Sequence, residues 1–504
     1  MLMILLAQAV FLPIALSPIA YLLGKRYGSR SAWFSFVVLL YGTILTLLAG
    51  SISSDYIESY DWSPLGTFGL RADGLSIPFA ATICILATAL TVYSIPYMTH
   101  RISEEVSNLP ENERKNAFNS KIGLYFAFFL LYTAGMYGAV LATNLIQFYI
   151  FFELMLIPSY FLIAEFGYGD RDRISFLYFL WTHIGALILL AGLLTIAFFS
   201  GSFDYAGVSD ASIPGLVRGW VAAAITIGLF VKLAAFGLHI WLPHAHAEAP
   251  APISALLSPA MIGIGGYALI RFLVFLLPSV YQNITFVIAI WGLVTMIYGG
   301  SMALAQDDIK RVLAYSSISQ MGYLIFGIST ASYIGISGSV LHYVSHGMAK
   351  AILFMTAGAI ILQTGGIRNI SKLGGLASKL PYTATAALIG FLVIIGIPPM
   401  IGFQSEWMIF SGAITGAFHQ GSSLHLAIAI LALVATPLTA GYALLTMKRV
   451  FFGKLPDHLS SVREASPIIT GPLLFLASLS VILGIYPSIV NDRIVPLLWM
   501  VLGV

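Results

Sequence analysis

The hydrophobic and polar positions of this chain alternate on the scale of whole helices. Apolar runs of about 20 residues, enough to cross roughly 30 Å of hydrocarbon, are separated by short polar breaks, and the pattern predicts about fourteen membrane spans. The predicted spans are residues 2–23, 31–50, 74–98, 122–142, 144–165, 174–200, 219–240, 251–278, 283–305, 309–330, 333–363, 381–416, 424–450 and 468–490. Continuous runs of this length exclude a transmembrane barrel, which has short alternating segments.

Composition agrees with this pattern. Of the 504 residues, 59% are hydrophobic and 9% are charged, whereas about a quarter are charged in soluble domains. We therefore expect an all-α polytopic membrane protein with a single membrane domain, 1–504. Within it we distinguish three N-terminal spans, two repeats, and a C-terminal loop with the last span, at residues 1–121, 122–280, 281–452 and 453–504.

The basic residues predict the orientation of the chain. Loops that alternate to one side hold 18 of the 24 lysines and arginines, loops on the other side hold four, and Lys232 and Lys350 lie inside predicted spans. Because positive loops face the cytoplasm, both termini are expected on the outer side of an energy-transducing inner or plasma membrane. The net charge of +3 therefore reflects topology and does not indicate nucleic acid.

Two predicted spans contain helix-breaking residues in the middle, from Gly237 to Pro243 and from Gly396 to Pro399. In lipid, such breaks are tolerated only where protein or a water-filled cavity satisfies the freed backbone groups. Broken helices at matching positions of two halves are typical of inverted-repeat transporters. The pattern predicts two inverted five-helix repeats, formed by spans four to eight and nine to thirteen.

Four ionisable residues lie near the middle of apolar runs: Glu153, Lys232, Lys350 and Glu406. Each costs roughly 2.5–3.5 kcal/mol at the bilayer centre unless it is paired or hydrated. Four such residues on separate spans indicate a path for ions or protons.

Glu153 and Lys232 are predicted to be partners, because an opposite charge is the least costly way to keep Glu153 in the membrane. A nearby carboxylate favours a charged lysine and burial favours a neutral one, so the pair can act as a switch. A static ion pair between two helices is the alternative. His183, in the span 174–200, is an accessory candidate that can reach the same region.

His342, His346 and Lys350 follow one another at four-residue spacing. On a helix they share one face at a separation of about 6 Å, which suits a hydrogen-bonded proton relay. Polar contacts between helices are the alternative. Haem ligation is disfavoured because two histidines so close on one helix cannot face two stacked haems.

Glu406 follows the second helix break and suits an exit group at the end of the path. The alternative is a carboxylate that caps the second half-helix and is stabilised by the helix dipole.

His239, His244 and His246, with Glu248, lie around the first break. His239 and His244 are further accessory candidates. Metal binding by this set is possible in chemical terms, but side chains in such a loop more often bond freed backbone groups, and we expect no metal.

The sequence contains no cofactor signature. Its single cysteine, Cys84, excludes a cysteine-ligated cluster, and Gly167-Tyr168-Gly169 lacks the third glycine of a dinucleotide site. We expect no redox cofactor in this chain.

Four segments carry a resemblance to a known family: WLPHAHAEAPAPISALL, ALAQDDIKRVLAYSSISQMGY, LHYVSHGMAKAILF and GIPPMIGFQSEW. They resemble the antiporter-like membrane subunits of respiratory complex I, and the likeness extends over nearly the whole chain. Position 406 is a glutamate, whereas sister subunits usually have lysine there. In this respect the sequence resembles chain M, the subunit 4 type.

The resemblance implies fourteen spans, inverted repeats and a proton path at the membrane centre. It assigns Glu153 and Lys232 as the switch, the span 333–363 as connector and Glu406 as outlet. It also implies that the chain is a subunit of a proton-translocating NADH:quinone oxidoreductase and that its partners are other membrane subunits of that complex. Iron–sulfur clusters, flavin and quinone are then expected in partner subunits.

The chain departs from the family pattern at two positions. Relatives usually have a lysine where this chain has Gly263, and often a histidine at Gln320. The row of His342, His346 and Lys350 is more similar to the sister subunit L, to cation/proton antiporters and to membrane-bound hydrogenases. The alternatives are therefore a subunit of a multi-subunit sodium/proton antiporter, or a non-conducting membrane subunit of a hydrogenase.

Overall fold

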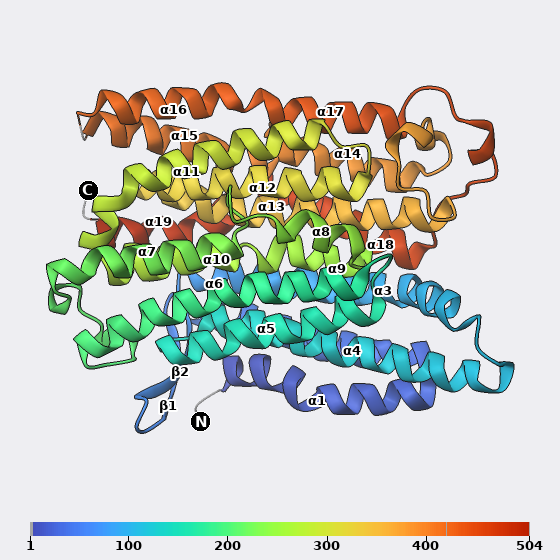
Figure 1. Ribbon diagram of the computed structural model, residues 1–504, viewed down its shortest axis with the longest axis horizontal. Coiled ribbons are helices and arrows are strands. Elements are labelled where there is room, and N and C mark those ends of the chain that lie inside the picture. Colours follow the sequence, from blue (N-terminus) through green and yellow to red (C-terminus); the bar gives the residue numbers. More distant parts are fainter. Residues whose placement is uncertain (1–3, 420, 503–504) are drawn as a thin grey trace.

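The computed structural model describes residues 4–419 and 421–502, which form one bundle of helices that run side by side (Figure 1). The α-helices are α1 Leu5–Tyr27, α2 Ala32–Ile52, α3 Ser76–Val106, α4 Glu111–Leu141, α5 Leu145–Phe166, α6 Arg171–Ser200, α7 Gly215–Lys232, α8 Trp241–Glu248, α9 Ala251–Leu256, α10 Ile264–Leu269, α11 Pro278–Leu304, α12 Ile309–Ile328, α13 Tyr333–Gln363, α14 Pro381–Ile395, α15 Ile401–His419, α16 Ser423–Ala435, α17 Pro437–Phe451, α18 Pro467–Ile485 and α19 Ser488–Leu502.

Eleven helical segments of the described residues are long and apolar enough to cross a membrane. One of them, Leu5–Ile52, contains both α1 and α2, which are joined at Gly28–Ser31 and pack against each other. The prediction of a helical polytopic membrane protein is thus confirmed. The central helix α13 has the predicted bounds and is buried over most of its length. The count of fourteen spans and the inverted repeats stay predictions.

Both predicted helix breaks are present. In the first, α7 ends at Lys232 and α8 begins at Trp241. In the second, α14 ends before Gly396, which has a left-handed backbone (φ 74°), and α15 begins at Ile401. Pro243 lies inside α8 and not in the break, because a proline is tolerated in the first turn of a helix.

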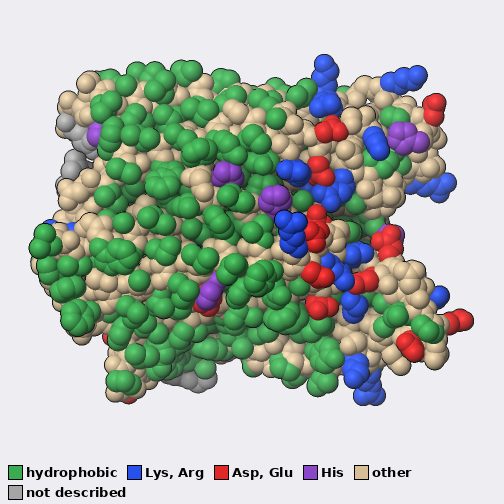
Figure 2. All heavy atoms as spheres, in the orientation of Figure 1, with side chains coloured by type: hydrophobic (Ala, Val, Ile, Leu, Met, Phe, Trp, Pro, Cys, Tyr) green, Lys and Arg blue, Asp and Glu red, His purple; other side chains and the backbone are tan. Residues whose placement is uncertain are grey.

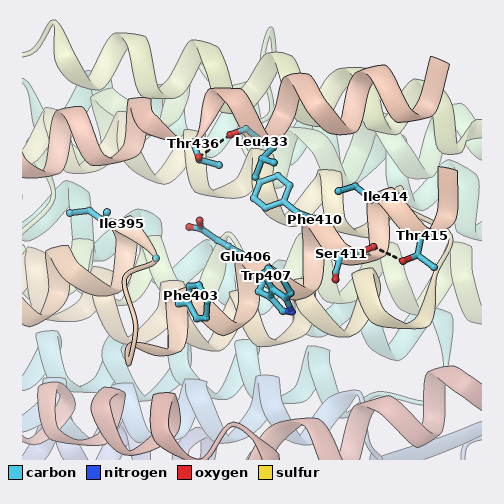
Figure 3. Close-up of a pocket in the computed structure, with 11 residues that line it drawn as sticks. Ile395, Phe403, Glu406, Trp407, Phe410, Ser411, Ile414, Thr415, Leu433 and Thr436 are labelled. Atoms are coloured by element: carbon cyan, nitrogen blue, oxygen red, sulfur yellow. Dashed lines mark hydrogen bonds between the residues drawn. The ribbon is translucent and has the colours of Figure 1, made fainter. Parts of the chain in front are cut away.

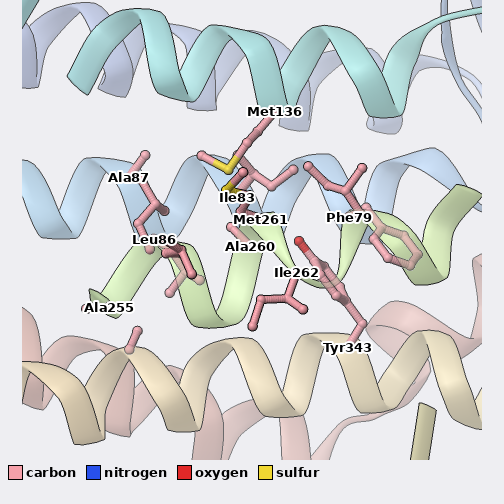
Figure 4. Close-up of a cluster of buried hydrophobic side chains, with 14 of the residues drawn as sticks. Phe79, Ile83, Leu86, Ala87, Met136, Ala255, Ala260, Met261, Ile262 and Tyr343 are labelled. Atoms are coloured by element: carbon pink, nitrogen blue, oxygen red, sulfur yellow. The ribbon is translucent and has the colours of Figure 1, made fainter. Parts of the chain in front are cut away.

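The predicted span 251–278 is one helical segment with two π-helical stretches, η4 Leu257–Met261 and η5 Ile270–Leu276. Apolar side chains of η4 pack with α3, α4 and α13 at the centre of the bundle (Figure 4). π-helical stretches often occur at functional sites.

One element was not predicted. The polar stretch 51–73 contains an antiparallel hairpin, β1 Tyr56–Asp61 and β2 Thr67–Ala72, so the fold is not entirely α. The buried carboxylate of Glu58 on β1 accepts hydrogen bonds from the backbone nitrogens of Leu6 and Ala7, at 2.8 and 2.9 Å. The hairpin thereby satisfies free N–H groups at the start of α1.

The two ends of the bundle differ in charge. Figure 2 shows lysine, arginine, aspartate and glutamate atoms gathered at one end of the visible face and hydrophobic atoms over the rest. We call this the charged end; it contains the loops 107–110, 305–308 and 364–380. The opposite end, with β1 and β2, is the hairpin end (Figure 1).

Candidate proton path

Glu153 on α5 pairs with a histidine of the next helix. Its Oε2 lies 3.0 Å from Nδ1 of His183 on α6, within ion-pair distance. The His183 ring stacks on Phe179, with ring centroids 5.4 Å apart. The Glu153 and His183 side chains are 16% and 34% exposed, so the pair lies at the outer surface of the bundle.

Lys232 is the last residue of α7 and is fully buried. The carbonyl groups at a helix C-terminus favour a cation at this position. Its Nζ also lies 4.7 Å from the centroid of the Phe152 ring, a cation–π contact.

Glu153 and Lys232, predicted as partners, do not form a direct ion pair. Among the described residues no carboxylate oxygen lies within 4.0 Å of the Lys232 amine. Successive residues of a helix point about 100° apart, and it is Phe152, not Glu153, that faces the amine. Glu153 still acts on Lys232 electrostatically.

Lys350 lies in the middle of α13 and has no exposed surface. Its Nζ donates hydrogen bonds to the carbonyl oxygen of Leu313, at 3.0 Å, and to the hydroxyl of Ser316. Both acceptors belong to α12, so α12 supplies the polar environment of the buried amine. Tyr442 of α17 lies close to Ser316 and extends this polar region toward Glu406.

His342 connects α13 to the second helix break. Its Nδ1 lies 3.1 Å from the hydroxyl of Ser405, which precedes Glu406. The His342 ring stacks on Tyr323, with centroids 5.5 Å apart, and the Tyr323 hydroxyl lies 3.1 Å from that of Thr439. The predicted row of α13 thus contacts α15, the helix that carries Glu406, at the residue before it.

His346 and His246 are buried, and neither ring has a hydrogen-bond partner for its nitrogens among the described residues. His246, on α8, stacks on Phe354 of α13, with centroids 4.7 Å apart. Both histidines lie within electrostatic range of Lys350. The structure therefore adds His246 to the buried row, although the sequence placed it only around the break.

The two accessory histidines around the first break lie elsewhere. His239 is buried, and its Nε2 lies 3.1 Å from the hydroxyl of Tyr298 on α11. His244 is exposed on α8. Among the described residues no group of three or more His, Cys, Asp or Glu side chains is placed to hold a metal ion.

Lys310, at the start of the predicted span 309–330, is a buried cation. It lies in the first turn of α12, and its Nζ donates to the carbonyl oxygens of Ala247 and Ala249 at the end of α8. A cation at this position satisfies carbonyl groups that a helix end leaves free. A polar cavity of about 550 Å³ lies nearby at the charged end, between Glu248, Asp308 and Arg368.

Glu406 lies in the second turn of α15 and borders a cavity of about 430 Å³. Figure 3 shows its carboxylate pointing into the cavity, toward Ile395 of α14 and Thr436. Its Oε1 is buried and has no hydrogen-bond partner among the described residues. Trp407 in the cavity wall is 62% exposed, so the cavity opens on the outer surface of the bundle.

Tyr343 fills the space beside Gly263. A Cβ added at Gly263 would overlap the Tyr343 ring. This ring stacks on Phe79 with centroids 4.1 Å apart, and its hydroxyl points from α13 into the central apolar cluster (Figure 4). The hydroxyl has no hydrogen-bond partner among the described residues.

Two more buried tyrosines lie between Glu153 and Tyr343. The Tyr178 hydroxyl lies 2.7 Å from that of Ser159 and within the field of Glu153. Tyr132 interacts electrostatically with both Tyr178 and Tyr343. No pattern in the sequence singles out these residues, because the chain has 25 tyrosines and the face on which each lies depends on helix packing.

Comparisons with known proteins agree with this architecture. Residues 142–430 match the family described as NADH:quinone oxidoreductase/Mrp antiporter, TM. F(420)H(2) dehydrogenase subunit M of Methanosarcina mazei is 33% identical over 92% of each chain. An NAD(P)H-quinone oxidoreductase chain 4 of Nostoc sp. is 30% identical over 97% of this chain and 89% of its own length.

Solved structures are similar over almost the whole chain. A chain of respiratory complex I from Thermus thermophilus superposes with a TM-score of 0.83 at 25% identity, over 99% of both chains. A chain of the Mrp complex from Dietzia sp. superposes with a TM-score of 0.85 at 25% identity, over 99% of this chain and 52% of that one. This chain therefore belongs to the NADH:quinone oxidoreductase/Mrp antiporter membrane family, as an antiporter-like subunit of the complex I chain 4 or M type.

Proposed function

We propose that this chain conducts protons across the membrane and is driven by electron transfer in other subunits of a complex I-type quinone oxidoreductase. The path runs from Glu153 and Lys232, across the centre, along α13 and out through Glu406. The observation that carries the proposal is the row of buried titratable side chains along α13, which ends one residue from Glu406.

The two helix breaks support opposite charges at the two ends of the path. Lys232 lies at the C-terminus of a half-helix, where carbonyl groups favour a cation. Glu406 lies in the second turn of another half-helix, one turn beyond the free N–H groups of its N-terminus. The two helix breaks thus place a basic and an acidic group at the two ends of the proposed path.

Buried polar atoms without a protein partner support a hydrated path. They include both ring nitrogens of His246 and His346, Nε2 of His342 and Oε1 of Glu406. Leaving such atoms unpaired costs about 1–3 kcal/mol each, and ordered water is the usual way to satisfy them. Water between these side chains completes a chain along which protons move.

At the centre of the path no titratable side chain is available at position 263, which is a glycine. The proton therefore has to cross the centre through other groups. The hydroxyls of Tyr178, Tyr132 and Tyr343 follow one another from the Glu153 region to α13. A hydroxyl both donates and accepts hydrogen bonds. In our proposal these hydroxyls, with water, carry the proton across the apolar cluster that separates the two halves.

The setting of the chain follows from the same proposal. Its partners are other membrane subunits of the complex, and the flavin, iron–sulfur clusters and quinone belong to those partners. The charged end faces the cytoplasm, and both termini lie on the outer side of the energy-transducing membrane. This chain itself holds no redox cofactor. Its helices form two five-helix repeats of opposite orientation.

The test is Lys232→Ala and Glu153→Ala in the intact complex, reconstituted in vesicles with a pH-sensitive dye. Relatives are named for NAD(P)H and F(420)H(2), so both donors are tried. We expect donor oxidation by a soluble acceptor to be unchanged, while quinone-linked turnover and proton transport fall at least tenfold. Lys372→Ala, at the charged end, is the control. Normal transport in both variants would disprove the assignment.

Sodium/proton antiport is the second candidate, and the similarity to a chain of an Mrp complex favours it. It predicts sodium-dependent proton movement in vesicles without an electron donor. Proton movement that needs the donor and ignores sodium supports the first function.

A further inference from the structure

A long groove runs along α3 on one side of the bundle. Helices α2 and α18 both pack on α3. Two cavities of about 290 and 350 Å³ lie end to end between them and share Ile85 in their walls. The first extends to Gly50 and Ile77 at the hairpin end, and the second extends to Val92 and Gly471 toward the charged end.

The groove has the length of an acyl chain. On α3 its wall extends from Ile77 to Val92, which at 1.5 Å per residue is about 22 Å. This exceeds half of the roughly 30 Å hydrocarbon thickness of a bilayer. The groove therefore follows the membrane normal through one leaflet and beyond its midplane.

The wall of the groove offers no free polar side chain to a ligand along its length. The hydroxyls of Thr43 and Thr88 lie 2.9 Å apart, and the hydroxyl of Thr82 donates to the carbonyl oxygen of Pro78 at 2.8 Å. A water molecule needs two to four polar partners to be held in a cavity. The groove therefore favours an apolar chain over water.

One charge lies at the mouth of the groove. Arg493 of α19 borders the first cavity, and its Nη1 donates to the carbonyl oxygen of Gly50 at 2.5 Å. Arg493 forms no ion pair with any acidic side chain in the described part of the chain. A guanidinium has five N–H donors and matches the geometry of a phosphate.

We propose that a phospholipid occupies this groove, with one acyl chain between α2 and α18 and its phosphate on Arg493. Arg493 lies at the hairpin end, near the ends of α2 and α3, which is the level of a headgroup whose chain enters the groove. The lipid links α2 and α3 to the C-terminal helices. This inference does not depend on the proton path.

Gly471 offers a way to block the groove. A Cβ added at Gly471 meets no atom within 4 Å, so the leucine of Gly471→Leu fits the helix and fills the space of the acyl chain. Gly219→Leu is the matched control, because Gly219 on α7 is also open but lies outside the groove. Arg493→Gln removes the phosphate ligand, and Arg493→Lys keeps the charge.

The intact complex is purified, washed in detergent and analysed for retained phospholipid by native mass spectrometry. We expect one phospholipid fewer per complex with Gly471→Leu and with Arg493→Gln, a smaller loss with Arg493→Lys, which keeps the charge but not the guanidinium, and no change with Gly219→Leu. Added phosphatidylglycerol should raise the melting temperature of the washed parent complex more than that of Gly471→Leu. Equal lipid counts in all variants would overturn the proposal. So would a cross-link from Gly471→Cys to another subunit, which would place a protein in the groove.

Discussion

The imidazole Nδ1 of His183 lies 3.0 Å from Oε2 of Glu153, so the direct partner of this carboxylate is a histidine of the next helix, while Lys232 interacts with it from a greater distance. Lys232 lies instead on the ring of Phe152. Glu153 thus has as its direct partner an imidazole ring, whose nitrogens can both donate and accept hydrogen bonds. The charge on Lys232 then responds to Glu153 through the field between them.

His183→Phe should reduce proton transport about tenfold, because it removes a charge-assisted hydrogen bond of about 1.5 kcal/mol and keeps a ring against Phe179. Transport is measured in vesicles that contain the intact complex. His100→Phe, at an exposed site on α3, should have no effect. Equal transport by the two variants would mean that His183 has only a packing role.

Gly396→Ala should impair transport without loss of assembly. A Cβ at Gly396 would lie 2.8 Å from Oε2 of Glu406, so the carboxylate has to move, and the positive φ of 74° adds strain. The matched control is Gly453→Ala, which has a φ of 89° and no atom within 4 Å of the added Cβ. Backbone strain alone would affect both variants equally, whereas displacement of Glu406 affects only the first.

Tyr343→Phe tests the centre of the path. It keeps the ring that fills the space beside Gly263 and removes only a hydroxyl without a protein partner, so stability should change little. Transport should fall at least tenfold, and oxidation of the donor by a soluble acceptor should stay constant. Tyr125→Phe removes a buried hydroxyl bonded to Ser94 and is the control. If both variants pump normally, the proton crosses the centre by another route.

Asp73→Asn should make the stability of the complex depend less on pH. Burial alone would raise the pKa of Asp73, but the Arg271 guanidinium, 2.8 Å away, together with the backbone N–H of Ser76 and the charge of Arg71, outweighs burial and holds this pKa below its ordinary value. A lowered pKa stabilises the fold above about pH 4, and this contribution is lost as the pH falls through the folded-state pKa.

The variant should therefore be destabilised by about 3–5 kcal/mol at neutral pH, because Arg271 is left as an unpaired buried charge. The difference in melting temperature between parent and variant should shrink as the pH is lowered below about 4. Asp55→Asn, at a largely exposed pair with Arg71, is the control and should cost no more than about 1 kcal/mol. A difference that grows at low pH would contradict the assignment.

Much of the architecture could be predicted because lipid imposes a strong rule on sequence. A helix that crosses the membrane needs a long apolar run, and α13 was predicted with the bounds that the structure has. Both helix breaks were predicted from glycine and proline. The hairpin β1–β2 was missed because a short polar stretch of irregular pattern gives no strand signal, and its buried Glu58 acts through a tertiary contact with α1.

The sequence by itself determined which side chains are out of place in lipid, and hence the class of protein and the candidates Glu153, Lys232, Lys350 and Glu406. Only the tertiary structure decided their partners. Composition and spacing give a residue's depth in the membrane but not the direction in which its helix face points. Rotation of α5 and α6 brings Glu153 to His183, and packing of α8 on α13 brings His246 into the buried row, because helix faces are set by neighbours far apart in the chain.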